Sequence, residues 1–123
     1  MISSHGRRTA LAVTLIGMAG CGSDSPAAPE NTEPVATNAI TVRDNFFTPS
    51  NVSVPAGETL TWTWAGGDQH NVTWVAAGLP NSPTQSSGAH QVTLSDAVSG
   101  TLSYYCTIHG TPTSGMRGLV QVQ

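Results

Sequence analysis

A strict polar–apolar alternation runs through Thr59-Leu60-Thr61-Trp62-Thr63-Trp64, which places three large apolar side chains on one face. A period of two is typical of a strand buried on one side. Shorter runs of the same period occur on both sides of it, separated by Gly, Pro, Asn and Ser. We expect further strands near residues 40–43, 52–54, 71–75, 90–94, 101–106 and 119–122. This pattern predicts an all-β fold, a two-sheet Greek-key β-sandwich of about seven to eight strands.

The first twenty residues have the layout of an export signal. Arg7 and Arg8 precede an apolar stretch that is shorter than the ~20 residues of a transmembrane helix. The stretch Met18-Ala19-Gly20-Cys21 resembles the lipobox of bacterial lipoproteins, in which the cysteine becomes the acylated N-terminus. We therefore expect residues 1–20 to be a lipoprotein-type signal peptide and Cys21 to be lipidated. The alternative is an ordinary signal peptide cleaved nearby, and the sequence allows export by either the Sec or the twin-arginine route.

Composition divides the rest of the chain into two parts. Residues 21–38 are rich in Ser, Pro, Ala, Glu and Asn. Such a segment cannot bury a core, so we expect a flexible tether there and one folded domain over residues 39–123. Within the domain, residues 76–89 lack periodicity and are rich in Gly, Pro, Asn and Ser. We expect them to form a long crossing loop with at most one helical turn.

Charge and cysteine content exclude several functions. Once the signal is removed, seven acidic residues stand against Arg43 and Arg117, and the chain has no lysine. A nucleic-acid surface is therefore not expected. If Cys21 is acylated, Cys106 has no disulfide partner. Because unpaired thiols are unusual in an oxidising compartment, Cys106 is better explained as a metal ligand.

Candidate ligands gather in the C-terminal run Tyr104-Tyr105-Cys106-Thr107-Ile108-His109-Gly110-Thr111-Pro112-Thr113-Ser114-Gly115-Met116, and a further histidine, His70, follows a turn-rich stretch upstream. Each has a simpler explanation when it is taken alone. Cys106 could be a buried small hydrophobe, Met116 could be core filler, and His70 could be a polar turn residue. Met116 lies between Gly115 and Gly118, however, so we expect it in a loop rather than on an alternating apolar face, and this position favours a ligand. Together, two histidines, a thiolate and a thioether are the donor set of a blue-copper electron-transfer site.

The order and spacing of these residues resemble a small bacterial cupredoxin of the plastocyanin/azurin family of type 1 blue copper proteins. The resemblance is carried by His70-Asn71-Val72, by the run from Cys106 to Met116, and by Phe47-Thr48-Pro49 and Gly57. It implies one copper ion, Cu(I)/Cu(II), held in a plane by His70, Cys106 and His109 with Met116 as a long axial ligand. Six residues separate His109 from Met116, more than in the plastocyanin and amicyanin types.

The resemblance also implies roles for residues around the metal. The side chain of Asn71 would brace the ligand loop by hydrogen bonding to the backbone near Thr107. The ring edge of His109 would be exposed in an apolar patch through which electrons pass. We expect Ile108 and Pro112, together with Leu79 or Pro80, to contribute to this patch.

We therefore expect a monomeric carrier of single electrons that meets protein redox partners transiently. It would lie in the periplasm or on the extracytoplasmic face of a bacterial membrane, attached to that membrane by the lipid on Cys21.

A module for copper delivery or storage is the alternative, although the chain beyond the signal has only Met116 and few histidines to offer. An enzyme is not expected, because a second, open copper site would need several more histidines. A metal-free adhesion module would show no copper spectrum, and zinc is a lesser possibility.

Overall fold

The computed structural model describes residues 33–123, and every regular element within them is a β-strand. The strands are β1 (Val35–Ala36), β2 (Ala39–Arg43), β3 (Phe46–Thr48), β4 (Asn51–Val54), β5 (Thr59–Trp64), β6 (Thr73–Trp74), β7 (Ala89–Thr93), β8 (Gly100–Gly110) and β9 (Gly115–Val122). No helix in this part of the chain is long and apolar enough to cross a membrane. The expectations for residues 1–20, for Cys21 and for most of segment 21–38 concern residues outside the described range.

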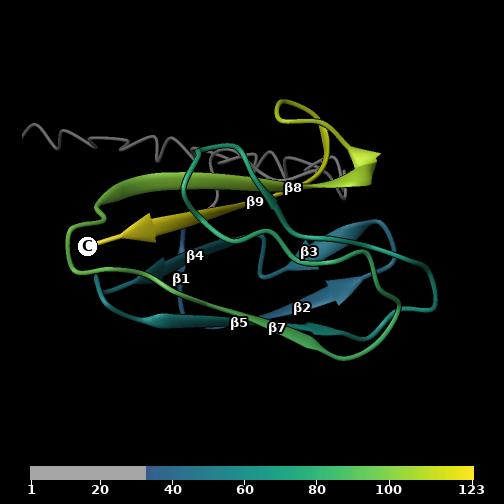
Figure 1. Ribbon diagram of the computed structural model, residues 1–123, viewed down its shortest axis with the longest axis horizontal. Coiled ribbons are helices and arrows are strands. Elements are labelled where there is room, and N and C mark those ends of the chain that lie inside the picture. The colour runs from purple at the N-terminus through teal and green to yellow at the C-terminus, as the bar shows by residue number, and fades with distance from the viewer. Residues whose placement is uncertain (1–32) are drawn as a thin grey trace, which may run out of the picture.

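The strands form two mixed sheets that lie face to face (Figure 1). One sheet has the order β1-β4-β9-β8-β6 and the other has the order β3-β2-β5-β7. The predicted all-β, two-sheet sandwich is confirmed. The described residues form more strands than expected because two short ones, β1 and β3, have no alternating pattern long enough to be recognised.

The core fills the space between the sheets, because the strands other than β1, whose two residues are exposed, turn their apolar side chains inward. In β9 the pattern is regular: every second residue from Met116 to Val122 is buried. The aromatic side chains interlock at the centre, where the ring of Tyr104 makes edge-on contacts with Phe47 at 4.8 Å and with Trp62 at 5.3 Å between centroids. Such edge-to-face pairs are a favourable arrangement of aromatic rings. The three tryptophans, Trp62, Trp64 and Trp74, are all buried, as expected for core residues.

The pairing of β8 with β9 is interrupted at the segment richest in candidate ligands. Regular antiparallel pairing continues to Tyr105↔Arg117 and resumes only at Gly110↔Gly115. The register shift between them releases residues 106–109 from regular pairing, and such irregularities redirect side chains. The turn beyond is closed by a hydrogen bond from the N–H of Thr111 to the carbonyl of Ser114, 2.8 Å long. This geometry brings the ligand-rich segment to one end of the sandwich.

Two local expectations were wrong. Met116 was expected in a loop, but it lies on the buried face of β9, because the hairpin turn is short and pairing resumes at Gly115. Val35 and Ala36 fall inside the segment expected to be a tether, yet they pair in parallel with β4. Backbone hydrogen bonds to a sheet edge can order a segment of low apolar content. The segment between β6 and β7 is the expected long loop, and it contains no helical turn.

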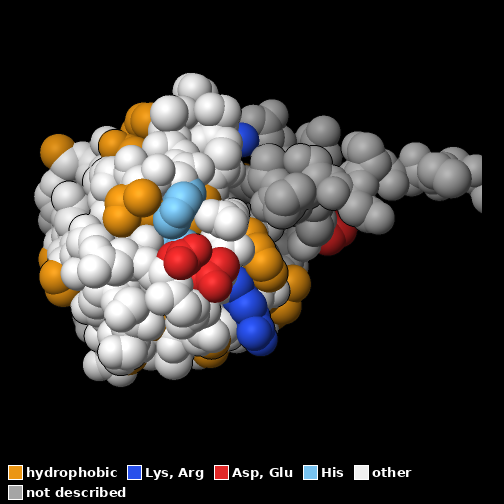
Figure 2. Space-filling view, turned by 90° about the vertical axis from the view of Figure 1, so that its right-hand side faces the viewer, with side chains coloured by type: hydrophobic (Ala, Val, Ile, Leu, Met, Phe, Trp, Pro, Cys, Tyr) orange, Lys and Arg blue, Asp and Glu red, His pale blue; other side chains and the backbone are white. Residues whose placement is uncertain are grey.

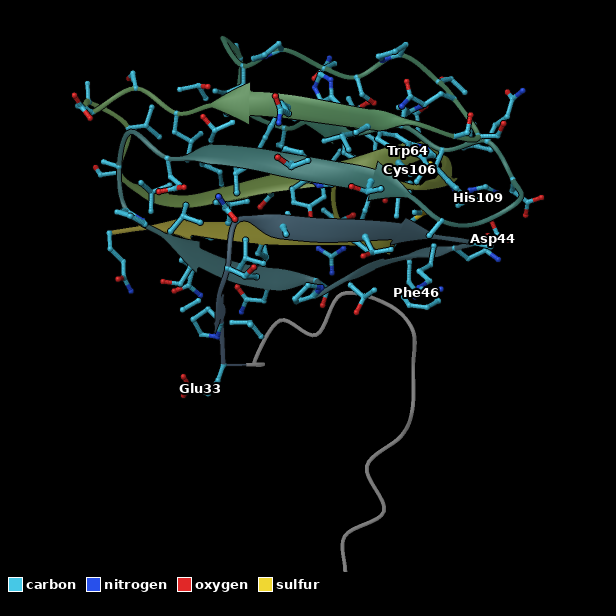
Figure 3. The ribbon with its side chains drawn as sticks, turned by 90° about the horizontal axis from the view of Figure 1, so that it is seen from below. Glu33, Asp44, Phe46, Trp64, Cys106 and His109 are labelled. Atoms are coloured by element: carbon cyan, nitrogen blue, oxygen red, sulfur yellow. The ribbon has the colours of Figure 1, made fainter. Side chains whose placement is uncertain are left out.

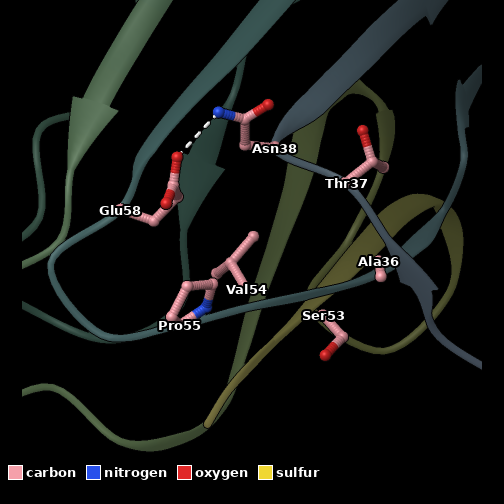
Figure 4. A pocket seen from close by; sticks show the side chains of 7 residues that line it. All are labelled: Ala36, Thr37, Asn38, Ser53, Val54, Pro55 and Glu58. Atoms are coloured by element: carbon pink, nitrogen blue, oxygen red, sulfur yellow. Dashed lines mark hydrogen bonds between the residues drawn. The ribbon is translucent and has the colours of Figure 1, made fainter.

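A shallow surface pocket of about 300 Å³ lies at the end of the molecule where β2 and β5 begin (Figure 4). Its walls come from β1, β4 and the turn after β4, including Pro55. The amide of Asn38 donates a hydrogen bond to the Glu58 carboxylate at 2.9 Å across one side. The candidate ligands lie at the other end of the strands, so this pocket is separate from them.

Candidate metal centre

His70 is held rigidly by backbone hydrogen bonds on both sides. Its N–H donates to the carbonyl of Gln85, and the N–H of Gln85 donates to the carbonyl of His70, each at 3.0 Å. The same His70 carbonyl accepts a bond from the buried indole N–H of Trp64 at 3.1 Å. The His70 side chain is 0% exposed. Its imidazole therefore has little freedom to move.

Three candidate ligand atoms converge at this end of the sandwich. The Nδ1 atoms of His70 and His109 lie 3.1 Å apart. The Sγ atom of Cys106 lies 3.9 Å from Nδ1 of His70 and 3.8 Å from Nδ1 of His109. Cys106 and His109 come from β8, whereas His70 follows β5 in the opposite sheet. Figure 3 shows Cys106 and His109 at the same end of the strands.

The spacing of these atoms fits a single metal ion. The point equidistant from the two nitrogens and the sulfur lies about 2.1 Å from each, within the range of first-row metal–nitrogen and metal–sulfur bonds. Two imidazoles and a thiol form a donor set suited to copper or zinc. Cys106 is a free, fully buried thiol. The three side chains are thus already arranged as one face of a metal site.

Met116, expected as the axial ligand, is buried at the start of β9. Its backbone lies against Gly110, since a side chain at position 110 would come within 2.7 Å of the N and O atoms of Met116. Gly110 directly follows His109. Met116 therefore lies beside the segment that carries two of the converging ligands, and its role as a ligand remains a prediction.

Asn71 joins the two chain segments that carry the ligands. Its side-chain oxygen accepts a hydrogen bond from the backbone N–H of Thr107 at 3.0 Å, and its amide donates to the Thr107 hydroxyl at 2.8 Å. The amide also donates to the hydroxyl of Thr84 at 3.1 Å. Asn71 is buried next to His70, and Thr107 follows Cys106. These bonds fix the distance between the two segments.

The sequence analysis missed Asp44, which lies just beyond the end of β2. Its carboxylate accepts a hydrogen bond from Nε2 of His70 at 3.0 Å. This bond, followed by the backbone N–H groups of Asp68 and Gly67, lowers the pKa of Asp44 to about 2. Only the strand topology could have indicated this contact. Because β2 and β5 are parallel neighbours, Asp44 after β2 and His70 beyond β5 lie at the same end of the sheet.

The surface over the cluster combines apolar and acidic groups. Ile108 is 51% exposed, and the adjacent His109 is partly buried. Figure 2 looks onto this end of the molecule and shows a histidine with hydrophobic side chains on one side and acidic side chains on the other. A partner molecule could therefore approach one edge of the cluster without any rearrangement of the strands.

Comparison with known proteins shows the family of the chain. Residues 36–123 match the model of the family described as copper binding proteins, plastocyanin/azurin family. The chain belongs to this family. A plastocyanin from Scenedesmus fuscus is 30% identical over 86 residues, which cover 63% of this chain and 86% of that protein.

Solved structures of cupredoxins have a fold similar to that of this chain. A purple cupredoxin from Nitrosopumilus maritimus superimposes with a TM-score of 0.58 and 27% identity, covering 69% of this chain and 98% of that one. A variant of amicyanin solved with Cu(I) gives a TM-score of 0.55 and 30% identity, covering 70% of this chain and 83% of that one. The family and the converging ligand atoms together support one copper ion as the cofactor of this protein.

Proposed function

We propose that this protein is a mononuclear type 1 copper protein that carries single electrons between protein partners outside the cytoplasm. The observation that carries the proposal is the convergence of His70, Cys106 and His109, with ligand atoms 3.1 to 3.9 Å apart, in a member of the plastocyanin/azurin family. We assign His70, Cys106, His109 and Met116 as the residues that would hold the ion. Copper bound there supplies one-electron exchange between its two oxidation states.

The chain itself supplies a rigid set of ligands. The backbone bonds of His70 and the hydrogen bonds of Asn71 hold the donor atoms in place before the metal binds. A site held by supporting contacts changes little when its charge changes. Small rearrangement favours fast electron exchange over metal release, so a carrier fits the geometry better than a module for copper delivery.

His109 is the proposed point of electron transfer. Its ring is partly buried against the ligand cluster, and the side chain before it, Ile108, is exposed. A small apolar patch suits brief encounters, because weak redox complexes bury little surface. We propose that redox partners dock over this patch and that the protein acts as a monomer.

The membrane attachment is a separate proposal that rests on the sequence Met18-Ala19-Gly20-Cys21. We propose that the exported protein is lipidated at Cys21 and remains in the periplasm or on the extracytoplasmic face, attached to a bacterial membrane. Expression of the full chain in a bacterium fed a labelled fatty acid tests this. The label should appear in the wild type and be absent from Cys21→Ser, and an unlabelled wild-type protein would exclude the lipid anchor.

The copper assignment is tested by adding Cu(II) to the purified protein and recording its visible spectrum. The wild type should develop a strong thiolate-to-copper absorption band, and Cys106→Ser should lose it. His70→Ala and His109→Ala should weaken or shift the band, whereas the matched change His90→Ala, in a histidine outside the cluster, should leave it intact. A colourless wild type would refute the proposal. A coloured protein that releases its copper on reduction would favour copper delivery instead.

A further inference from the structure

The two ring nitrogens of His70 have different partners, and the difference fixes where its proton lies. Nε2 lies 3.0 Å from Oδ1 of Asp44. Nδ1 faces the sulfur of Cys106 and Nδ1 of His109. An ionised carboxylate can only accept hydrogen bonds, so the proton of a neutral imidazole belongs on Nε2. The lone pair of Nδ1 then points into the cluster, as metal binding requires.

The carboxylate of Asp44 is itself held in place by the turn that leads to His70. Oδ1 accepts a hydrogen bond from the N–H of Asp68 at 2.9 Å, and Oδ2 accepts one from the N–H of Gly67 at 3.1 Å. Gly66 lies so close that a side chain there would overlap the Asp44 carboxylate. Although the Asp44 side chain is 43% exposed, three hydrogen bonds therefore fix its position.

A fixed anion on the far side of an imidazole acts through the ring. It orients the ring, selects its tautomer and increases the basicity of the nitrogen that binds the metal. A more basic nitrogen and a nearby negative charge stabilise Cu(II) more than Cu(I), because the former carries the larger positive charge. The reduction potential therefore depends on the Asp44–His70 pair as well as on the ligands themselves.

We infer that Asp44 is a positioning residue of the copper centre: its carboxylate fixes the tautomer and orientation of His70 and favours the cupric state over the cuprous state. This inference rests on the proposed ligation of copper by His70. Asp44 does not contact the metal in this assignment, and it acts only through the imidazole.

The test uses the full-length protein and three variants. Asp44→Asn keeps the shape of the side chain but removes its charge, and Asp44→Ala removes the acceptor. Asp68→Asn is the matched control, because it removes an exposed acidic charge two residues before His70 without removing the bond to the imidazole. Loss of the supporting contact to a metal-bound histidine typically weakens metal affinity by about 10–100-fold.

We expect Asp44→Asn and Asp44→Ala to lose Cu(II) affinity within that range while Cu(I) affinity changes less. Each tenfold difference between the two losses raises the reduction potential by about 59 mV. Asp68→Asn should keep the wild-type potential. An unchanged potential in both Asp44 variants, or an equal rise in Asp68→Asn, would overturn the inference.

A second measurement needs no substitution and no metal. Nitrogen-15 NMR of the metal-free wild type should show His70 protonated at Nε2, and in metal-free Asp44→Ala the two tautomers should be mixed. A wild-type His70 protonated at Nδ1 would refute the role of Asp44. If the wild type bound no copper, the proposed function would fail, yet the NMR result would still decide whether Asp44 selects the tautomer. The two failures are therefore distinguishable.

Discussion

The ring of Tyr104 lies over the bare backbone of Gly118, its direct partner across β8 and β9. A Cβ atom at position 118 would overlap the hydroxyl end of this ring. The ring cannot easily move aside, because Phe47, Trp62 and Trp74 surround it with centroids at 4.8 to 5.4 Å. Burial also raises the pKa of Tyr104. The packing of Tyr104 within the ligand-bearing β8–β9 hairpin therefore requires a glycine at position 118.

Gly118→Ala should therefore destabilise the fold. Overpacking of a dense core costs about 1–3 kcal/mol, and urea unfolding of the metal-free protein measures the loss. In a Tyr104→Leu background the same substitution should cost less, because the overlapping ring is gone. An equal cost in both backgrounds would show that the strain arises elsewhere.

Asn71→Ala should weaken the link between the two ligand-bearing segments. It removes two hydrogen bonds to Thr107 and one to Thr84, and because each contributes about 0.5–1.5 kcal/mol, we expect a loss of about 1–3 kcal/mol. The matched control is Asn38→Ala, which removes one exposed bond to Glu58 at the other end of the molecule. That change should stay within about 0.5 kcal/mol. Equal unfolding midpoints for the two variants would contradict the bracing role.

Ile108→Lys should slow electron exchange between two copies of the protein. It places a charge on the proposed contact patch, so two molecules meeting there repel each other and lose apolar contact. We expect a decrease on the order of tenfold in the self-exchange rate, measured by NMR line broadening of mixed oxidation states. Val75→Lys is a close control, since Val75 and Ile108 are both 51% exposed but Val75 pairs with Ser103, away from the cluster. Equal slowing in both variants would argue against a specific patch.

The stability of the metal-free protein should depend on Asp44 in acid. Folding lowers the pKa of this carboxyl from 3.8 to about 2. Between these values the unfolded chain binds more protons, so the contribution of Asp44 to stability is present above about pH 4 and is lost as the pH falls towards 2. Asp44→Asn should lose less stability over this window than the wild type. Parallel urea-midpoint curves for the two proteins from pH 4 to pH 2 would contradict this.

Much of the fold was predictable because its signals are local. The alternation around Trp62 identifies a strand from six adjacent residues, and similar runs predict the sandwich that the structure confirms. The candidate ligands were recognisable because Cys, His and Met in one run form an unusual chemical combination. The family and the copper cofactor followed from that combination, and the comparisons confirm both.

What the sequence did not reveal depends on pairing between distant strands. Asp44 lies 26 residues before His70, and the two meet only because β2 and β5 are parallel neighbours. Met116 looked like a loop residue because glycines flank it, but pairing that resumes at Gly115 places it on a buried strand face. Register shifts of this kind leave no periodic trace in the sequence.

The direction in which the chain enters the sandwich has a consequence for how the protein meets larger molecules. Figure 3 shows Glu33 towards one end of the strands and His109 at the other. An attachment of the chain ahead of Glu33 would leave the candidate metal centre at the end of the strands that lies farther from the attachment point. A large electron donor or acceptor could then approach the metal centre without contacting the structure to which the protein is attached.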